Sequence, residues 1–288
     1  MRAVYFLTSI KGARGGFTDG GRKRSFLETY PSPPKLKRTR RSAIIPVAEE
    51  RETIAQVIQS VRKVGVDEII VVANGADPLT KQIAMKQNVR LISFPERLGH
   101  NVGRAIGAAH ATGDVLLFVD GDFPIAPRDL SPFIQQVENG QVDVALNDLK
   151  PLLHRFVPID TISLFKYFLN LVLLRPDLYN NSLTAIPHAM SRRVLETIGF
   201  RSLMIPPLAQ VKAIRSGFKV GAVHYVDVVK PNRIREEHHI RNGRIPAFER
   251  IFGDHLEALH YLCQQTNIRG GLPDGERKRD MLKQLRRE

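Results

Sequence analysis

Short apolar runs alternate with segments of helical spacing between Ser42 and Val119. The helical segments repeat apolar residues every three or four positions, and the apolar runs are rich in β-branched residues. Strands and helices in this order predict right-handed β-α-β units and a mostly parallel sheet. Because the runs are apolar without interruption, we expect helices on both faces of that sheet. The predicted strands cover residues 43–46, 68–73, 89–93 and 115–119, and the predicted helices begin at Thr53 and cover 78–87 and 103–111.

Ligands of a parallel sheet bind beyond the carboxyl ends of its strands, so the loops that follow the strands are the candidate binding segments. The last such loop opens with Asp120-Gly121-Asp122, directly after a predicted buried strand. Two carboxylates so close together are costly unless a positive group binds them, and hard oxygen ligands suit Mg²⁺ or Mn²⁺. A plain turn in which the aspartates cap the next segment is the alternative. The candidate loops span residues 46–50, 73–77, 95–104 and 120–124.

The composition is that of a globular protein, with 43% hydrophobic and 25% charged residues. No run of eighteen uncharged apolar residues occurs, so we do not expect a transmembrane helix. The N-terminus lacks the pattern of a secretion signal, and the single cysteine, Cys263, cannot form an internal disulfide. These features predict a cytoplasmic protein.

The net charge of +14 is concentrated at the two ends of the chain. Residues 1–41 contribute +9 and residues 268–288 contribute +3, which leaves +2 for the remainder. Basic tails without a recognition motif argue against specific binding of nucleic acid. They are suited to peripheral contact with an anionic membrane surface.

The chain divides into four parts. Residues 1–41 are rich in Gly, Pro and charge and read as a poorly ordered extension, and residues 268–288 form a basic C-terminal tail. Residues 42–125 and 126–267 are the two halves of a single large domain. In the second half we expect helices over 162–174, 191–198, 208–216 and 247–265 and a strand over 220–229.

The segment from Ser42 to Phe123 resembles the nucleotide-sugar-binding half of glycosyltransferase family 2, which has the GT-A fold. Four motifs occur in the order and spacing of that family, which chance produces far less often than any one of them. The resemblance implies an α/β domain with a Rossmann-like, mostly parallel sheet flanked by helices. Its donor half would be 42–125 and its acceptor half 126–267. The motifs are Ile44–Glu50, Glu68–Gly75, Leu98–Gly107 and Ala111–Asp122.

The same resemblance implies roles in binding the nucleoside. Pro46, Val47 and Glu50 would line the nucleoside pocket. Asn74 would stand where the family usually has an aspartate that reads the base, and an amide can still donate and accept there. Because Ala73-Asn74 replaces the usual acidic pair, the resemblance predicts the identity of the nucleotide base less firmly than it predicts the fold.

Further positions are implied for the diphosphate and the metal. Gly99 belongs to the glycine-rich loop, and Arg104 would approach the base or the diphosphate, which a guanidinium binds well. Asp120 would lie near the ribose and the metal, and Asp122 would be the firmest ligand of Mg²⁺ or Mn²⁺. A third ligand is common in this fold, and we expect it to be His238, ahead of His224 and His239, because imidazole is a common metal ligand. Arg233 lies shortly before it and would help to neutralise the diphosphate.

The general base of the family is missing from its usual place. Inverting members need a carboxylate that deprotonates the acceptor, and residues 203–210 contain no Asp or Glu. Either the base is displaced, with Asp148, Asp160 and His188 as candidates, or the enzyme retains anomeric configuration. The second option is similar to glucosyl-3-phosphoglycerate synthases, which manage without such a base. His188 is also expected to line the site between donor sugar and acceptor.

The resemblance therefore implies a metal-dependent glycosyltransferase that uses a nucleoside-diphosphate sugar, with UDP as the expected nucleotide. The acceptor is not readable: a small acid, a glycan or a lipid-linked acceptor fits, the last because of the aromatic helix around Phe165–Phe168 and the basic tails. One alternative is a relative that binds sugar nucleotides without catalysis. Another is a nucleotidyltransferase, whose Gly-rich first loop is not found here.

Overall fold

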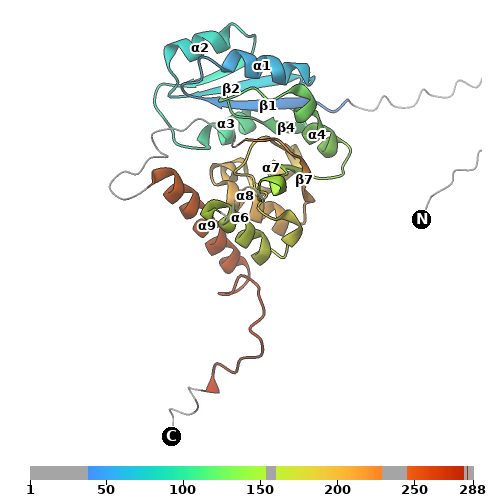
Figure 1. Cartoon of the computed structure of the whole chain (residues 1–288), viewed down its shortest axis with the longest axis vertical. Helices are drawn as coiled ribbons and strands as arrows, with labels where there is room; N and C mark the ends of the chain where they lie inside the picture. The colour runs from blue at the N-terminus through green and yellow to red at the C-terminus, as the bar shows by residue number, and fades with distance from the viewer. Residues whose placement is uncertain (1–37, 154–159, 229–244, 282–283, 285–288) are drawn as a thin grey trace, which may run out of the picture. The chain divides into compact units, whose positions relative to one another are not determined.

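The computed structural model describes residues 38–153, 160–228, 245–281 and 284 (Figure 1). Their strands form one sheet in the order β3-β2-β1-β4-β6-β5-β7. β6 runs antiparallel to β4 and β5, and the other neighbouring strands are parallel. The mostly parallel sheet predicted from the sequence is therefore confirmed. The strands are β1 (Arg41–Val47), β2 (Glu68–Asn74), β3 (Arg90–Phe94), β4 (Val115–Phe118), β5 (Val144–Asn147), β6 (His188–Ser191) and β7 (Val220–His224).

Helices cover both faces of this sheet, as the uninterrupted apolar strands require (Figure 1). Alternate residues of β1 point to opposite faces: Ala43 and Ile45 belong to one core cluster and Ile44 to the other. The first face packs on α1 (Ile54–Lys63), α2 (Pro78–Met85) and α4 (Pro127–Glu138). The second face packs on α3 (Val102–His110), α7 (Arg192–Ile198) and α8 (Pro206–Arg215).

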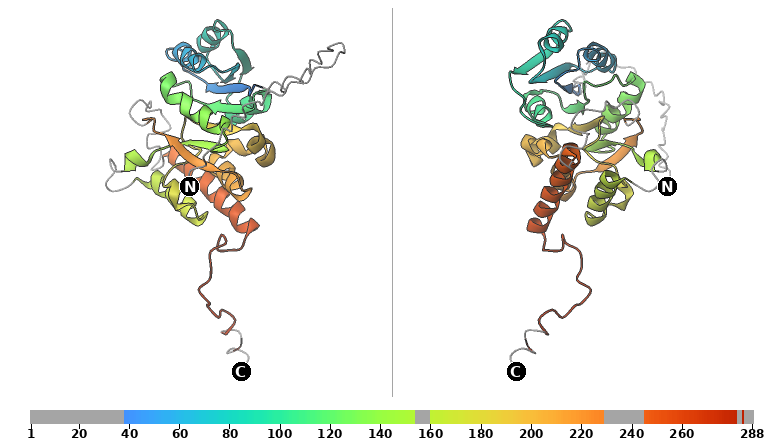
Figure 2. Two further views of the ribbon diagram at one scale, coloured as in Figure 1. Left: turned by 90° about the vertical axis from the view of Figure 1, so that its right-hand side faces the viewer. Right: turned by 60° about the vertical axis from the view of Figure 1, so that its left-hand side comes forward.

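A third apolar cluster lies outside the sheet. It joins α8 to α6 (Thr161–Val172) and α9 (Pro246–Gln265), which lie side by side (Figure 2). The remaining described helices are short: α5 (Lys150–Leu153), η1 (Pro176–Leu178) and η2 (Phe200–Met204). No helix among the described residues is long and apolar enough to cross a membrane.

The predicted boundary between residues 41 and 42 falls at the start of β1. The compact unit begins at Arg38, and Arg41 already pairs with Val115 of β4. The Arg41 guanidinium also donates to both oxygens of Glu138, at 2.6 and 2.8 Å. Arg38 also pairs with Asp67 at 3.1 Å, and the Arg40 backbone N–H donates to Asp114 at 2.8 Å, so residues 38–41 belong to the folded domain and not to the extension.

Among the described residues of the second half, the sequence missed six elements, namely α4, β5 and β6 and the short helices α5, η1 and η2. β6 contains His188 and inserts between β4 and β5, so segments distant in sequence close the sheet. Helix α4 contains Pro132, and its apolar residues point to the core from an otherwise polar segment. The strands β5 and β6 have four residues each, too few for periodicity to reveal them.

Candidate functional site

The carboxyl edge of the sheet brings the predicted site residues together. Asn74 ends β2, Asp120 follows β4, and His188 opens the antiparallel strand β6 directly opposite Phe118. These residues come from three separated segments, and the strand order places them at one edge of the sheet. This is the edge at which doubly wound sheets bind ligands.

Arg104 and Asp120 form a buried ion pair at this edge. The Nη2 atom of Arg104 donates to both carboxylate oxygens of Asp120, at 2.7 and 2.8 Å. The Arg104 side chain is only 7% exposed, whereas that of Asp120 is 30% exposed. Burial alone would raise the pKa of Asp120, but the charge and hydrogen bonds of Arg104 outweigh it and lower that pKa. Asp120 is therefore a fixed negative charge with one face open to solvent.

Two glycines of α3 allow Arg104 to reach this position. A Cβ at Gly107 would lie 2.5 Å from Ile44 Cγ2, and one at Gly103 would lie 3.1 Å from Pro46 Cβ. The helix therefore packs on β1 more closely than an alanine would permit. This close approach brings the buried Arg104, which lies between the two glycines in sequence, to the end of β4.

The loop after β1 is fastened to the Asp120–Asp122 turn. Thr53 Oγ1 donates to the carbonyl oxygen of Gly121 at 2.6 Å. A Cβ at Gly121 would lie 2.9 Å from Val47 Cγ1 and 3.2 Å from Glu50 Cγ. Its φ lies outside the left-handed region, so the glycine is required for close packing and not for the sharp turn expected from the sequence.

Pro46, Val47 and Glu50 serve to build this loop. Val47 belongs to the buried core, and Pro46 packs under α3. The buried carboxylate of Glu50 accepts a hydrogen bond from the Ala48 backbone N–H. The backbone carbonyl of Glu50 accepts one from the Ile54 N–H at the start of α1. These contacts give each residue a structural role, and the predicted contact with a nucleoside stays a prediction.

Asn74 uses its side-chain amide to hold the loop before α3. Its Nδ2 donates to the Gly99 carbonyl at 2.9 Å, and its Oδ1 accepts from the Leu98 N–H at 2.6 Å. An aspartate could not donate the first of these bonds. Gly99 has a φ of +104°, which a residue with a side chain rarely adopts. The amide at position 74 therefore makes a loop contact that an aspartate could not make in full.

His188 is packed beneath the site. Its ring stacks on Phe118 with centroids 4.9 Å apart, and its Nδ1 is bonded to the Ala185 carbonyl at 2.9 Å. Burial, assisted by the charge of Arg104, lowers the pKa of His188 to about 3. A ring so reluctant to take up a proton is not suited to the role of a displaced general base. The structure supports a role for His188 in shaping the floor of the site.

The other candidate bases are occupied as well. Asp160 caps α6 by accepting from the Ser163 N–H at 2.9 Å. Asp148 accepts from the Lys150 N–H at 3.2 Å and from the Asn181 amide at 3.4 Å. Both carboxylates therefore stabilise local structure.

His238, the predicted third metal ligand, lies outside the described residues, as do Arg233 and His239. His224 is described, and its Nε2 lies 3.1 Å from Asp129 Oδ1 at the start of α4. This pair ties the end of β7 to α4. Among the described residues, no three His, Cys, Asp or Glu side chains gather as a set that could hold a metal ion.

The donor chemistry of Asp120 and Asp122 still fits a hard divalent cation. Both carboxylates follow one strand, and both are only partly buried. Asp120 is kept ionised by Arg104, as a ligand of Mg²⁺ or Mn²⁺ must be. One or two carboxylates are the usual protein ligands of Mg²⁺ where substrate phosphates and water complete the shell.

One residue near the site escaped the sequence analysis. His100 lies close enough to Asp120 for its charge to lower the pKa of that carboxyl. It belongs to the loop that Asn74 holds, which the strand-end rule had already selected. The histidine itself carried no pattern to distinguish it from a surface residue.

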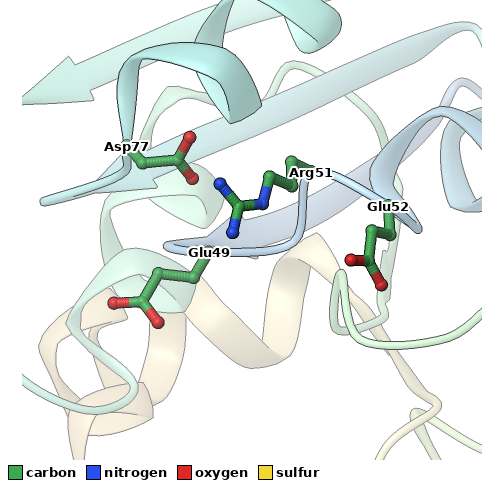
Figure 3. A pocket seen from close by; sticks show the side chains of 4 residues that line it. All are labelled: Glu49, Arg51, Glu52 and Asp77. Carbon is green, nitrogen blue, oxygen red and sulfur yellow. The ribbon is translucent and has the colours of Figure 1, made fainter.

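A pocket of about 330 Å³ lies beside the same loops and is lined by Glu49, Arg51, Glu52 and Asp77 (Figure 3). Arg51 lies between Asp77 and Glu49 in this view. Asp77 caps α2 through the Leu79 and Thr80 N–H groups, and Glu49 pairs with Arg97. The pocket includes neither Asp120 nor Asp122, so we assign it no ligand.

Comparisons with known proteins agree with this geometry. Residues 42–150 match the family model described as "Glycosyl transferase family 2". A protein of Mycobacterium tuberculosis (strain CDC 1551 / Oshkosh), named "Putative glycosyltransferases", is 28% identical over 133 residues. That match covers 41% of this chain and 35% of the relative, so the chain spans about a third of the length of that relative.

Solved structures of similar fold include glucosyl-3-phosphoglycerate synthase of M. tuberculosis. Its complex with Mn²⁺, uridine diphosphate and glucosyl-3-phosphoglycerate has a TM-score of 0.56 at 18% identity, and the match covers 82% of each chain. Its complex with Mg²⁺ and uridine diphosphate has a TM-score of 0.53 at 18% identity, over 82% of this chain and 81% of that one. The domain has the GT-A fold, and its residues 42–150 match the model of glycosyl transferase family 2.

Proposed function

We propose that this protein is a metal-dependent glycosyltransferase that takes its sugar from a nucleoside-diphosphate sugar, with UDP as the nucleotide. The observation that carries the proposal is the Arg104–Asp120 pair next to Asp122 at the carboxyl edge of the sheet. The match of residues 42–150 to glycosyl transferase family 2 and the likeness to a fold solved with uridine diphosphate and Mn²⁺ support the same conclusion.

The residues of this edge would divide the work of donor binding. The loop of Pro46, Val47 and Glu50 would cradle the nucleoside, with the loop that Asn74 holds at Gly99 on its other side. Arg104, already buried and charged, would add positive potential where the leaving diphosphate accumulates charge. Arg233 is proposed to act on the same diphosphate.

Asp120 and Asp122 would hold Mg²⁺ or Mn²⁺, with His238 as the proposed third ligand. When bound, the cation would supply charge neutralisation for the departing diphosphate. The chain's own contribution would be to keep the two carboxylates ionised and the turn that carries them in place. Arg104 serves the first task and Thr53 the second.

We propose that transfer proceeds with retention of the anomeric configuration. Residues 203–210 contain no carboxylate, and each displaced candidate has another role: His188 is buried and neutral, Asp160 caps a helix, and Asp148 holds backbone. The test is NMR of the hexose that is first released from a UDP-α-sugar by slow transfer to water. An α-hexose supports retention, and a β-hexose contradicts it.

The donor assignment is tested by nucleotide binding and turnover. A thermal-shift screen of nucleoside diphosphates and their sugars, with and without Mn²⁺, should give its largest metal-dependent shift with a uridine compound. Asp122→Ala should leave the thermal transition without ligand nearly unchanged. It should lower the rate of UDP release from the cognate donor by at least about a hundredfold.

Asp177→Ala is the matched control. Asp177 is an exposed carboxylate that pairs with Arg175. The Arg175 guanidinium also donates to the carbonyl of Val220 at the start of β7, which lies opposite the carboxyl edge of the sheet that carries the site. This variant should keep full turnover. Near-full turnover in Asp122→Ala would overturn the metal assignment.

A protein that binds sugar nucleotides without catalysis is the second candidate. The missing carboxylate of residues 203–210 and the engagement of Asn74 in its own loop favour it. Such a protein would show the metal-dependent thermal shift but would release no UDP from any donor during prolonged incubation. The match to glycosyl transferase family 2 speaks against the nucleotidyltransferase alternative.

The remaining partners belong to the same proposal. The acceptor would be a small acid, a glycan or a lipid-linked molecule, and no specific nucleic-acid partner is expected. We propose a cytoplasmic location with peripheral membrane contact, supported by the basic charge of the chain ends.

A further inference from the structure

Helix α6 exposes apolar residues on its outer side. This side carries Leu164, Phe168 and Leu171, which are 48%, 47% and 40% exposed and follow the i, i+4, i+7 spacing of one helix face. The buried side holds Leu169 and Val172, which pack in the third apolar cluster, together with Ser163 and Asn170. A surface helix of a protein that meets only water carries polar residues on its outer side.

Specific hydrogen bonds hold the polar residues of α6 that face the protein interior. Asn170 Nδ2 donates to the carbonyls of Tyr179 and Asn181 at 2.7 and 3.0 Å, and its Oδ1 accepts from Gln210 at 2.7 Å. Lys166 lies on this side as well, close enough to the buried His255 of α9 to affect its titration. The helix therefore cannot rotate to hide its apolar residues without breaking a buried amide network.

The exposed apolar residues continue beyond the end of α6. Leu174 is 74% exposed, with a φ of +58° that turns the chain sharply there. Beside it runs the segment that follows α9: a Cβ at Gly270 would lie 3.1 Å from Val172 Cγ1. Ile268 of that segment is 87% exposed. We call Leu164, Phe168, Leu171, Leu174 and Ile268 the apolar stripe.

The segment that follows α9 is basic. Asp274 is shared there by the guanidinium groups of Arg269, Arg277 and Arg279, and with Glu276 and Asp280 included residues 268–281 carry a net charge of +1. Residues 268–288 together carry +3. An apolar helix face flanked by basic residues is the pattern of an interfacial membrane anchor.

We propose that the apolar stripe docks on the surface of an anionic lipid bilayer, with the basic C-terminal segment against the headgroups. A second copy of the chain fits this surface less well, because it would bring together two basic C-terminal segments on chains of net charge +14. The proposal rests on the peripheral membrane contact of the proposed function and names the surface that makes it, and it does not depend on the donor site.

Co-sedimentation of the full chain with vesicles tests the proposal. Binding is expected to vesicles of phosphatidylcholine with roughly 30% phosphatidylserine, to weaken with added salt, and to be nearly absent with phosphatidylcholine alone. The variant that combines Leu164→Gln, Phe168→Gln and Leu171→Gln should partition to the anionic vesicles at least about tenfold more weakly. Its far-UV circular dichroism and metal-dependent UDP binding should equal those of the unchanged chain.

The matched control combines Leu79→Gln and Met85→Gln on α2, two apolar side chains that are 46% and 67% exposed away from the stripe. It should bind the anionic vesicles like the unchanged chain. Equal vesicle binding by the α6 variant would overturn the choice of surface, and absence of binding at low salt would overturn the choice of a bilayer. A dimer in sedimentation velocity that the α6 variant loses would assign the stripe to a second copy instead. Absence of vesicle binding would also remove the proposed peripheral membrane contact. Because vesicle binding needs no nucleotide, it would leave the proposed glycosyl transfer standing, and failure of the glycosyl transfer would leave the membrane proposal standing.

Discussion

Helices α3 and α6 each carry a basic side chain on the inner face, and the two halves of the domain treat these cations differently. On the donor side, Arg104 finds both oxygens of Asp120 within 2.8 Å. On the other side, burial lowers the pKa of Lys166 to about 8, with the charge of Asp160 as a partial offset. A guanidinium in a fork of hydrogen bonds is a fixed charge, whereas a buried ammonium is a cost that the fold carries. In the donor half, the buried charge of Arg104 is paired and helps to build the site. In the other half, the buried charge of Lys166 lowers the stability of the fold.

The largest effect should follow from removing the partner of Arg104. Asp120→Asn leaves a nearly buried guanidinium opposite a neutral amide, so the free energy of unfolding should fall by about 3 kcal/mol in urea titration. The exposed pair of Arg175 and Asp177 provides the comparison, since Asp177→Asn should cost about 0–1 kcal/mol. Equal losses of unfolding free energy in the two variants would show that the buried Arg104–Asp120 pair stabilises the protein no more than the exposed Arg175–Asp177 pair.

A smaller effect is expected from the close packing of α3. Gly107→Ala places a methyl group 2.5 Å from Ile44 Cγ2, and the helix must shift to accept it. The free energy of unfolding should fall by about 1–3 kcal/mol, and metal-dependent UDP affinity should fall with it as Arg104 moves. In Gly253→Ala, a Cβ on α9 meets nothing within 4 Å, so this control should gain about 0.5–1 kcal/mol from helix propensity. Unchanged UDP affinity in Gly107→Ala would separate the helix packing from the site.

The smallest effect concerns Lys166 and the pH dependence of stability. Its folded pKa of about 8 lies below the ordinary 10.5, so the native state binds fewer protons than the unfolded chain between these values. Stability should therefore rise as the pH increases through this window. Lys166→Met should flatten that rise and, because the side chain keeps some contact with solvent, stabilise the protein at pH 7 by only about 1 kcal/mol. Burial lowers the pKa of the nearby His255, so its imidazole stays neutral between pH 8 and 10.5, and urea titrations of the unchanged chain and Lys166→Met in this range isolate the lysine.

The donor half could be predicted well from the sequence because its strands and loops follow from patterns of neighbouring residues. Strands β1, β2 and β4 each contain a continuous apolar run, and a parallel sheet places the residues after such runs at one edge. Asp120 and Arg104 could be placed at that edge from their positions alone. Their contact could not, because it depends on how closely Gly103 and Gly107 let α3 approach β1.

The second half was less predictable because its organisation depends on distant contacts. Strand β6 is recognisable as a strand only once β4 and β5 are beside it. The role of Asn74 was similarly hidden, because its partners Leu98 and Gly99 lie 24 and 25 residues away. His188 illustrates the same limit: a neutral, buried ring and a reactive one have the same letter in the sequence, and only the stacking on Phe118 separates them.

The hydrogen bond from Thr53 to the carbonyl of Gly121 has a thermodynamic consequence for donor binding. It joins the loop proposed to hold the nucleoside to the turn proposed to hold the cation, so restricting the motion of one restricts the other. Whichever ligand arrives first then bears the entropic cost of ordering both segments. The second binds to a site that is already ordered, and linkage makes the gain equal in both directions. Nucleotide and cation would therefore raise each other's affinity by the same factor, through a bond that touches neither of them.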